Sequence, residues 1–338
     1  MKEKMANMRL FVVCSVVFPL FAATANADLI LGTPLSGFTV LGGSTVTNVP
    51  TSAIGGNVGV WSSGGANAIT GFNSSPGVAV SDLQVTGTVQ AGTPDAATAQ
   101  GQLTTAINDL NTLSGTLEPA DLVGLTLFPG VYIVPAGVTN LSGMLTLDGE
   151  GNANAAWVFL MSSTLITSPN SVVDVINTGA GAGVYWDVRS SATIDTDTTF
   201  MGNILALASI SMNTGATDDC GRALASTGAV TLQMNSLSSG CSGILSGSSG
   251  LSGGLTVTPG VDNGPPVVSA LPFSAVSAVP EPSNFLFLAI CCAGLAIHRE
   301  RVRRAVSRRP GNASIRRTPA SSILCGAVAE EERGCVPS

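Results

Sequence analysis

The sequence predicts a mostly β protein built as a parallel β-solenoid with one long helix packed alongside. The main observation is a pattern that occurs three times, beginning with VYWDV at 184–188, GNILA at 202–206 and GRALA at 221–225. Each copy continues with a short alternating segment and a hydroxyl-rich stretch, and the first two copies are offset by 18 residues (210 − 192). Three short strands in a repeat of this length are typical of a solenoid, whose coils stack on one another.

Composition agrees with this fold class. The 338-residue chain is 45% hydrophobic but only 10% charged, and it contains 40 glycines. A large core is therefore available, while Thr, Ser, Asn and Gly rather than charged residues must cover much of the surface.

One segment reads as a long helix. Pro94 and Asp95 are suitable for its first turn, and apolar residues at helical spacing predict that it spans about 94–113. The stripe comprises Ala99, Leu103, Ile107 and Leu110. Such a stripe must cover another apolar surface, which we expect to be one flank of the solenoid.

Strand patterns lie on both sides of this helix. Short Gly-, Thr- and Val-rich runs over 31–89 predict strands and turns, and alternating runs resume from 121 onward. We therefore expect a β-helix domain over 28–242. The Ser-, Gly- and Pro-rich residues 243–278 are predicted to form a flexible linker.

Charge excludes several functions. Between residues 28 and 278 two basic residues, Arg189 and Arg222, stand against fifteen acidic ones, a net charge of −13 (2 − 15). Nucleic-acid binding needs a basic footprint, so we expect no nucleic-acid partner. The only histidine, His298, lies outside this span. A histidine-based catalytic or metal site in the main domain is therefore excluded, and we predict no cofactor and no metal.

Residues 1–27 are typical of a secretory signal peptide. Lys2, Lys4 and Arg9 form its basic end, 10–23 its apolar run, and the small residues ANA at 25–27 its cleavage site. The apolar run is short for a membrane-spanning helix. We therefore expect an exported protein that begins at Asp28.

The C-terminal part of the sequence carries a second targeting signal. Pro280, Glu281 and Pro282 precede an apolar run over 285–297 and the basic cluster HRERVRR at 298–304. Residues 279–304 resemble the PEP-CTERM sorting signal of Gram-negative bacteria. The resemblance implies transient membrane anchoring, processing by an exosortase-type enzyme, and residence at the cell surface or in an exopolysaccharide matrix. That signal usually ends at the arginines, whereas here a basic tail, 305–338, follows, and we expect it to be disordered or discarded.

Two cysteines, Cys220 and Cys241, fall inside the exported domain. An oxidising compartment favours a disulfide between them, with a pair of buried free thiols as the alternative.

Many ordered segments over about 31–237 resemble the DUF3494 ice-binding proteins. They include FTVL at 38–41, GLTLFPGVY at 124–132, LTLDGEG at 145–151 and NTGAT at 213–217. The resemblance implies a discontinuous right-handed parallel β-helix of triangular section with a long helix beside it. It also implies that the partner is an ice crystal surface, bound through a flat Thr/Ser-rich face, and we expect a monomer.

Two hydroxyl ladders are candidates for that face. Strand alternation points Thr193, Ser211 and Thr231 outward. The second ladder comprises Thr196, Thr198, Thr199, Thr214 and Thr217. We favour the second, because TGAT at 214–217 resembles the Thr-Ala/Gly-x-Thr/Asn pattern of ice faces in this family. Asp197 is a departure, since a carboxylate in the face would weaken contact with ice.

Other functions remain as alternatives. Asp187, Arg189, Asp195 and Asp197 suggest a glycosidase-like acid pair, but no cleft is evident and turn-capping aspartates are common. Asp218–Asp219 together with Asp195 or Asp197 suggests a calcium site built from carboxylate oxygens, yet no tight acidic loop is apparent. The strongest rival is a surface adhesin or biofilm-matrix protein that uses the same scaffold.

Overall fold

The computed structural model describes residues 28–65, 67–260 and 264–276. The predicted signal peptide, the sorting motif Pro280-Glu281-Pro282 and the basic tail lie outside these residues. No helix within the described ranges is long and apolar enough to cross a membrane.

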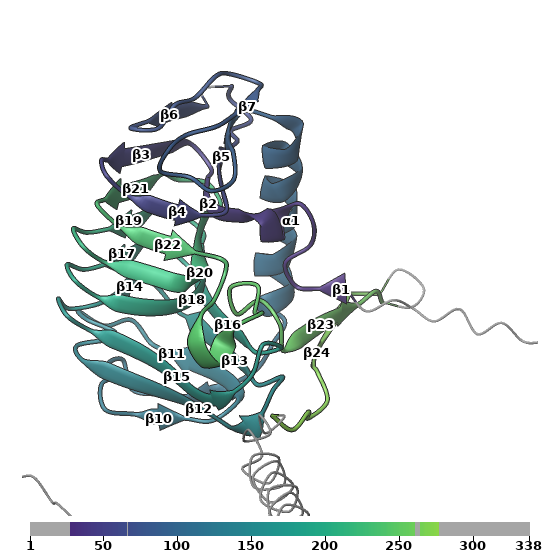
Figure 1. Cartoon of the computed structure of the whole chain (residues 1–338). Helices are drawn as coiled ribbons and strands as arrows, with labels where there is room; N and C mark the ends of the chain where they lie inside the picture. The colour runs from purple at the N-terminus through teal and green to yellow at the C-terminus, as the bar shows by residue number, and fades with distance from the viewer. Residues whose placement is uncertain (1–27, 66, 261–263, 277–338) are drawn as a thin grey trace, which may run out of the picture. The chain divides into compact units, whose positions relative to one another are not determined.

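The three-copy repeat forms successive coils, each with strands on three sides (Figure 1). Ala192 pairs with Ile210 and Ile210 with Val230, so the sequence offsets are the real stacking register. Parallel pairing of every coil with the next confirms a parallel solenoid of mostly β structure.

One side of the stack, which we call the helix side, carries ten hydrogen-bonded strands. In stacking order they are β7 (Ala79–Val80), β8 (Val89–Ala91), β5 (Asn57–Val60), β2 (Phe38–Gly42), β20 (Thr217–Ala225), β18 (Thr199–Ala206), β16 (Gly183–Val188), β13 (Ala156–Met161), β11 (Gly130–Val134) and β9 (Thr116–Leu117).

The second side is the six-stranded sheet, and all its pairings are parallel without register shifts. It comprises β14 (Leu165–Ile166), β17 (Ala192–Ile194), β19 (Ile210–Met212), β21 (Val230–Gln233), β3 (Thr45–Val49) and β6 (Ala68–Thr70). The third side comprises β10 (Thr126–Leu127), β12 (Met144–Asn152), β15 (Val172–Thr178), the first residues of β18 and β20, β22 (Ser236–Ser238) and β4 (Ala53–Gly55).

The coils do not stack in sequence order. β2, β3 and β4, from the N-terminal part of the chain, pair with β20, β21 and β22 of the last repeat. After the helix the chain resumes at the opposite end of the stack, with β9 and β10. The solenoid is therefore discontinuous.

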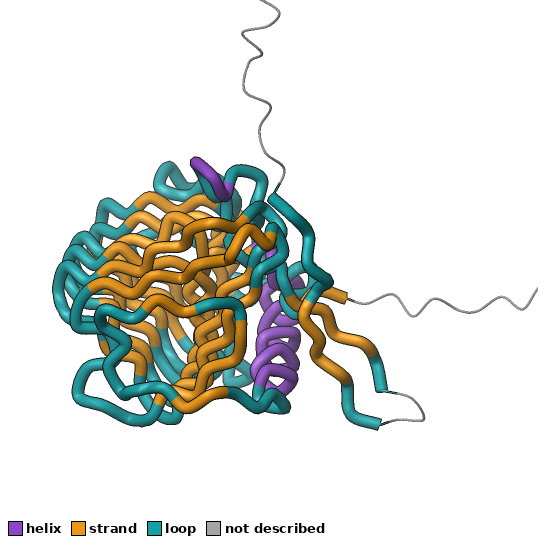
Figure 2. Tube along the Cα trace, turned by 90° about the horizontal axis from the view of Figure 1, so that it is seen from below, coloured by secondary structure: helices purple, strands orange, loops and turns teal. Residues whose placement is uncertain are grey.

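Two apolar cores hold this arrangement. The interior of the coils contains a stack of aromatic rings, in which the Phe159 and Trp186 centroids lie 4.0 Å apart. The second core lies between the helix side and α1 (Pro94–Leu110), where Leu103 and Leu110 pack with Leu205 and Leu224 of the strands. Figure 2 shows α1 running beside the stacked strands. The helix thus covers the flank that its stripe predicted, although it ends at Leu110 rather than near 113.

The N-terminus of α1 is capped by Thr93, whose side chain accepts a hydrogen bond from the Ala96 N–H at 3.2 Å. Pro94 follows at the first helical position, where a missing N–H is tolerated.

In place of the predicted flexible linker, residues 243–260 and 264–276 fold against the solenoid. Leu245, Leu251 and Leu255 are buried, and the segment contains η2 (Gly243–Leu245), β23 (Leu255–Thr258) and β24 (Val267–Ala270). β23 pairs with β24 and with β1 (Asp28–Leu29), while η1 (Leu35–Gly37) follows β1. Composition suggested a linker, but three leucines supply burial that a Ser/Gly count does not reveal.

Arg222 shows why this segment belongs to the fold. Its guanidinium is fully buried and donates to the carbonyl oxygens of Ser36, Ser249 and Gly250, at 2.7 to 3.2 Å. A buried charge needs such partners. Described residues on both sides of position 242 therefore belong to one folded unit, and a fragment ending at 242 would remove two of these carbonyls.

The predicted disulfide between Cys220 and Cys241 is present, with the two Cα atoms 4.7 Å apart. It joins β20 to the loop that follows β22.

Candidate functional site

The six-stranded sheet presents a continuous column of hydroxyl groups. Thr193, Ser211 and Thr231 pair in register, and the column continues through Thr47 and Thr70. Hydroxyls therefore occupy five neighbouring strands, about 4.8 Å apart by strand geometry. Sequence reasoning missed Thr47 and Thr70 because they lie in the N-terminal coil, which only the discontinuous stacking brings to this sheet.

The sequence-predicted alternation is confirmed here. The residues on either side of the column in each strand, such as Ala192, Ile194, Ile210 and Met212, are buried at 0–1% exposure. Within the described part of the chain, none of the hydroxyls of the five column residues forms a hydrogen bond with another protein group. These residues are Thr193, Ser211, Thr231, Thr47 and Thr70. These hydroxyls are therefore free to bind water.

A second outward column borders the first. In each strand it lies two residues before the first column, with one buried residue between them. It contains the small side chains of Ser191, Ser209, Ala229, Thr45 and Ala68. No outward position in these two columns carries a charge.

The nearest carboxylate, Asp195, follows directly after β17. It accepts hydrogen bonds at 2.8 Å from Asn213 Nδ2 and from the Thr196 N–H, and these bonds lower its pKa. Its charge is therefore held at the border of the sheet.

The turns that connect the six-stranded sheet to the third side stack on one another and share one backbone conformation. Asn170, Asp197, Gly215 and Met234 all have positive φ, between 52° and 74°. The N–H of each donates to a carbonyl of the next coil, for example Asp197 N–H to Thr214 O at 3.1 Å. Glycine, Asn and Asp suit this conformation best.

This explains the glycine of the TGAT motif. A Cβ at Gly215 would meet Asp197 Oδ1 at 2.2 Å, in addition to the cost of its φ of +74°. The second position of the motif is therefore favoured as glycine by the backbone and by the neighbouring Asp197 side chain, whatever the face binds.

One member of the favoured ladder faces inward. Thr198 is fully buried, and its hydroxyl lies 3.2 Å from Thr167 Oγ1 and donates to Ser168 O at 3.2 Å. Equivalent positions in neighbouring coils, Ser171, Asn235 and Ser52, are also buried and hydrogen-bonded. The prediction that Thr198 contributes to an outer face is wrong, because the left-handed residue at 197 turns the next side chain into the corner.

The other members of that ladder remain accessible on the third side and its turn. Thr199 pairs with Thr217, and Thr217 with Ser236. Thr196 and Thr214 lie in the stacked turns, and Thr214 Oγ1 contacts Gln233 Oε1 at 3.2 Å. Of these four threonines, only Thr199 and Thr217 lack a hydrogen bond from their hydroxyl within the described chain.

The third side is less uniform than the six-stranded sheet. Two residues beyond Thr217 lies Asp219, whose carboxylate accepts a hydrogen bond from Ser236 Oγ at 2.6 Å. Asp174, on β15, occupies the corresponding outward position two coils away.

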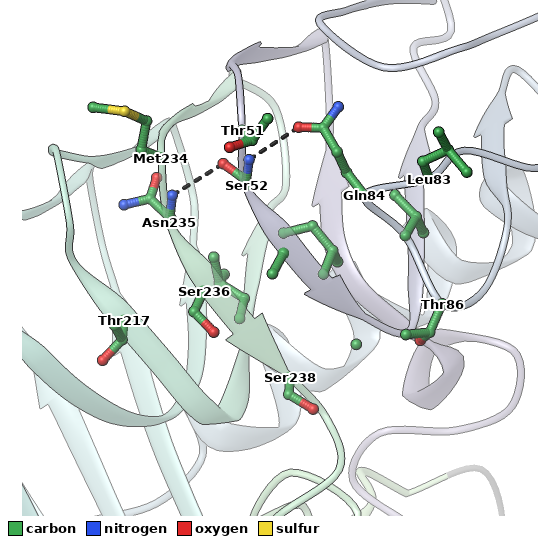
Figure 3. Close-up of a pocket in the computed structure, with 15 residues that line it drawn as sticks. Thr51, Ser52, Leu83, Gln84, Thr86, Thr217, Met234, Asn235, Ser236 and Ser238 are labelled. Carbon is green, nitrogen blue, oxygen red and sulfur yellow. Dashed lines mark hydrogen bonds between the residues drawn. The ribbon is translucent and has the colours of Figure 1, made fainter.

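A groove of about 880 Å³ interrupts this side beyond Thr217 (Figure 3). Leu83 is fully exposed on one flank and Met234 is half-exposed on the other. Ser52 links the two flanks, because its N–H donates to Gln84 Oε1 and its hydroxyl accepts from the Asn235 N–H. A flat solid could not contact both flanks and the floor of such a groove.

The four residues considered for catalysis do not converge. Asp187 is completely buried and 3.9 Å from Arg189, and desolvation raises its pKa to about 6. Asp195 and Asp197 instead lie on the stacked turn. Among the described residues, no three His, Cys, Asp or Glu side chains gather in a way that could hold a metal ion.

Asp218 is also buried, pairing with Phe200 and Leu237 inside the coils. Desolvation raises its pKa well above the ordinary value. It is therefore separated from the exposed Asp219, and the two do not present a joint carboxylate pair.

Comparison with known proteins gives a consistent result. Residues 40–238 match the family model described as Ice-binding-like. The chain is 46% identical over 230 residues to an ice-binding protein of Nostoc sp. (strain HG1), covering 67% of this chain and 80% of that one. It is 31% identical to an ice-binding protein of Flammulina populicola, covering 62% and 88% of the two chains. The crystal structure of an ice-binding protein from Antarctomyces psychrotrophicus superposes with a TM-score of 0.53 at 31% identity, covering 62% of this chain and 98% of that one.

Proposed function

The chain belongs to the Ice-binding-like family, and from this premise we propose that it adsorbs to ice through the outer face of its six-stranded sheet. The observation that carries the choice of face is the in-register column of Thr193, Ser211, Thr231, Thr47 and Thr70, whose hydroxyls have no partner in the described chain.

Ice is a solid made of the solvent itself, so the surface that binds it must order water cheaply. Threonine has a stiff χ1 angle, and little side-chain entropy is lost when it becomes fixed. Waters that bridge its hydroxyls cost little each and can merge with the crystal lattice. Rows about 4.8 Å apart and alternate residues about 6.7 Å apart supply a regular grid.

The third side satisfies these requirements less well. Asp174 and Asp219 hold their own hydration shells there, and the groove beside Leu83 breaks the plane. The third-side set favoured by the sequence remains a competing prediction for the ice-binding face, and tyrosine substitutions on the two faces distinguish them. This set comprises Thr196, Thr199, Thr214 and Thr217.

Adsorption would pin the advancing ice front and slow growth or recrystallisation, with no covalent step. We accordingly propose a non-enzymatic, monomeric protein whose solenoid is right-handed.

We also propose export and display at the surface of a Gram-negative cell. The signal-peptide pattern at 1–27, the sorting-signal pattern at 279–304 and the Cys220–Cys241 disulfide support an oxidising location. An exosortase-type enzyme and exopolysaccharide are the partners that this address implies. Fractionation of cells producing the intact chain or a Glu281→Ala variant tests it; an unprocessed, cytosolic intact chain would contradict the proposal.

The ice proposal is tested on residues 28–276, which include both cores and the segment bound to Arg222. Thermal hysteresis and recrystallisation inhibition are measured for this unit and for Thr231→Tyr and Thr217→Tyr, with circular dichroism as the folding control. Thr231→Tyr should abolish activity and Thr217→Tyr should leave most of it. The reverse pattern would move the binding face to the third side, and a folded but inactive parent would contradict ice binding altogether.

A further inference from the structure

A separate groove of about 450 Å³ lies between α1 and three turns of the solenoid. Trp61, Ser62 and Ser63 follow the end of β5 and form one part of its wall. The remaining lining comes from the turn at Gly43 and Ser44, from Ala97, Gln100, Gly101 and Thr104 of α1, and from Ser226 and Thr227 after β20.

The chemistry of this lining is distinctive. It contains no charged side chain, one aromatic ring, and several small hydroxyl residues. Trp61 is only partly buried, and within the described chain neither its indole N–H nor the hydroxyls of Ser44, Ser63 and Ser226 form a hydrogen bond. The groove thus combines an apolar ring with unsatisfied donors and acceptors.

Gln100 adds a buried acceptor beneath these groups. Its Nε2 donates to Ala225 O at 2.9 Å and to Ser226 O, which fixes the orientation of the amide. The Oε1 atom is buried and has no hydrogen-bond partner. Buried polar atoms in native proteins are nearly always satisfied, so this oxygen calls for a donor that reaches it, directly or through a water.

We propose that this groove binds a neutral saccharide. A sugar ring presents apolar C–H faces, which suit the indole ring, and peripheral hydroxyls, which suit the serines and the Gln100 oxygen. A purely apolar ligand would leave these polar groups unpaired, and an anionic one would meet a domain of net charge −13 (2 − 15 between residues 28 and 278). The volume fits a ligand of a few sugar units, because small-molecule sites usually measure roughly 300–1,000 Å³.

The tryptophans provide a direct readout. The chain has three, and the indole N–H groups of Trp157 and Trp186 donate internally to Leu127 O and Met201 O. In ¹H–¹⁵N spectra of residues 28–276, titration with maltotriose or cellotriose should shift only the indole signal that Trp61→Phe removes. The shift should saturate with a dissociation constant of about 1 mM. Trigalacturonate, an anionic trisaccharide, should leave the signal unmoved.

A blocking variant makes the site assignment strict. Gly101 lines the groove and a Cβ added to it meets no atom within 4 Å, so Gly101→Tyr places a bulky side chain at the groove. Thr98→Tyr, at an exposed position of α1 outside the groove whose side chain leans toward Pro94, is its matched control. Sugar-dependent shifts should disappear in Gly101→Tyr and persist in Thr98→Tyr. The proposal is overturned if neither neutral sugar moves the Trp61 signal, if trigalacturonate moves it equally, or if Gly101→Tyr responds like the parent.

Discussion

Replacing Asp187 by asparagine should stabilise the protein near neutral pH. The Asp187 side chain lies on the helix side between Leu160 and Leu205 of the neighbouring strands. It is completely buried, and neither carboxylate oxygen has a hydrogen-bond partner in the described chain. Its one counter-charge, Arg189, is 3.9 Å away and about half exposed, at 46%.

The magnitude follows from the pKa. Desolvation raises the pKa of Asp187 to about 6, whereas an ordinary aspartate titrates near ~3.9. A difference of this size corresponds to about 3 kcal/mol between pH 4 and pH 7. Because the folded state holds the proton more tightly than the unfolded state, this contribution is fully present below about pH 4 and is lost as the pH rises through about 6.

The assay is urea unfolding of the parent and of Asp187→Asn at several pH values from 4 to 7.5. The neutral amide keeps the shape without the charge, so the variant should gain about 1–3 kcal/mol over the parent at pH 7.5 and little at pH 4. Asp174→Asn, at a partly exposed position, is the matched control for the replacement of a carboxylate by an amide. A variant that is less stable than the parent at pH 7.5 would refute the reasoning.

Three further predictions concern the corner and the crosslink. Thr198→Val should lower the free energy of unfolding by about 1–2 kcal/mol, because it removes a buried hydroxyl bonded to Thr167, without changing recrystallisation inhibition; lost activity in a folded variant would return Thr198 to the ice face. Met234→Gly should raise the melting temperature by relieving a φ of +52°, a gain of about 1 kcal/mol, and a lower melting temperature would show that the turn is unstrained. Replacing Cys220 and Cys241 together by serine should cost about 3 kcal/mol in urea unfolding, because their 21-residue separation closes a loop; unchanged stability would contradict that assignment.

Much of the fold follows from periodicity. The 18-residue offset between Ala192 and Ile210 is the pairing register of their two strands, and the apolar stripe on α1 forms part of the second core. Period-two alternation also placed Thr193, Ser211 and Thr231 correctly on the outer surface, because strand parity depends only on local backbone geometry.

What failed depended on information that is not local. Thr198 turned inward because Asp197 adopts a left-handed conformation, which alternation does not anticipate. Thr47 joined the column only because the N-terminal coil stacks on the last repeat. Ser249 belongs to the fold because its carbonyl accepts a hydrogen bond from the buried Arg222, a contact across 27 residues that no local pattern indicates.

Incorporation of the protein into growing ice tests most directly whether the six-stranded sheet contacts ice. Solutions of residues 28–276, of Ser211→Tyr and of Thr199→Tyr are partly frozen at a slowly advancing front, and the protein in the ice fraction is measured. Ser211 lies in the column between Thr193 and Thr231, where a tyrosine would hold a flat crystal away from the hydroxyls of these two residues on the adjacent strands. We predict that the parent and Thr199→Tyr enter the ice while Ser211→Tyr is excluded; strong incorporation of folded Ser211→Tyr would contradict the account.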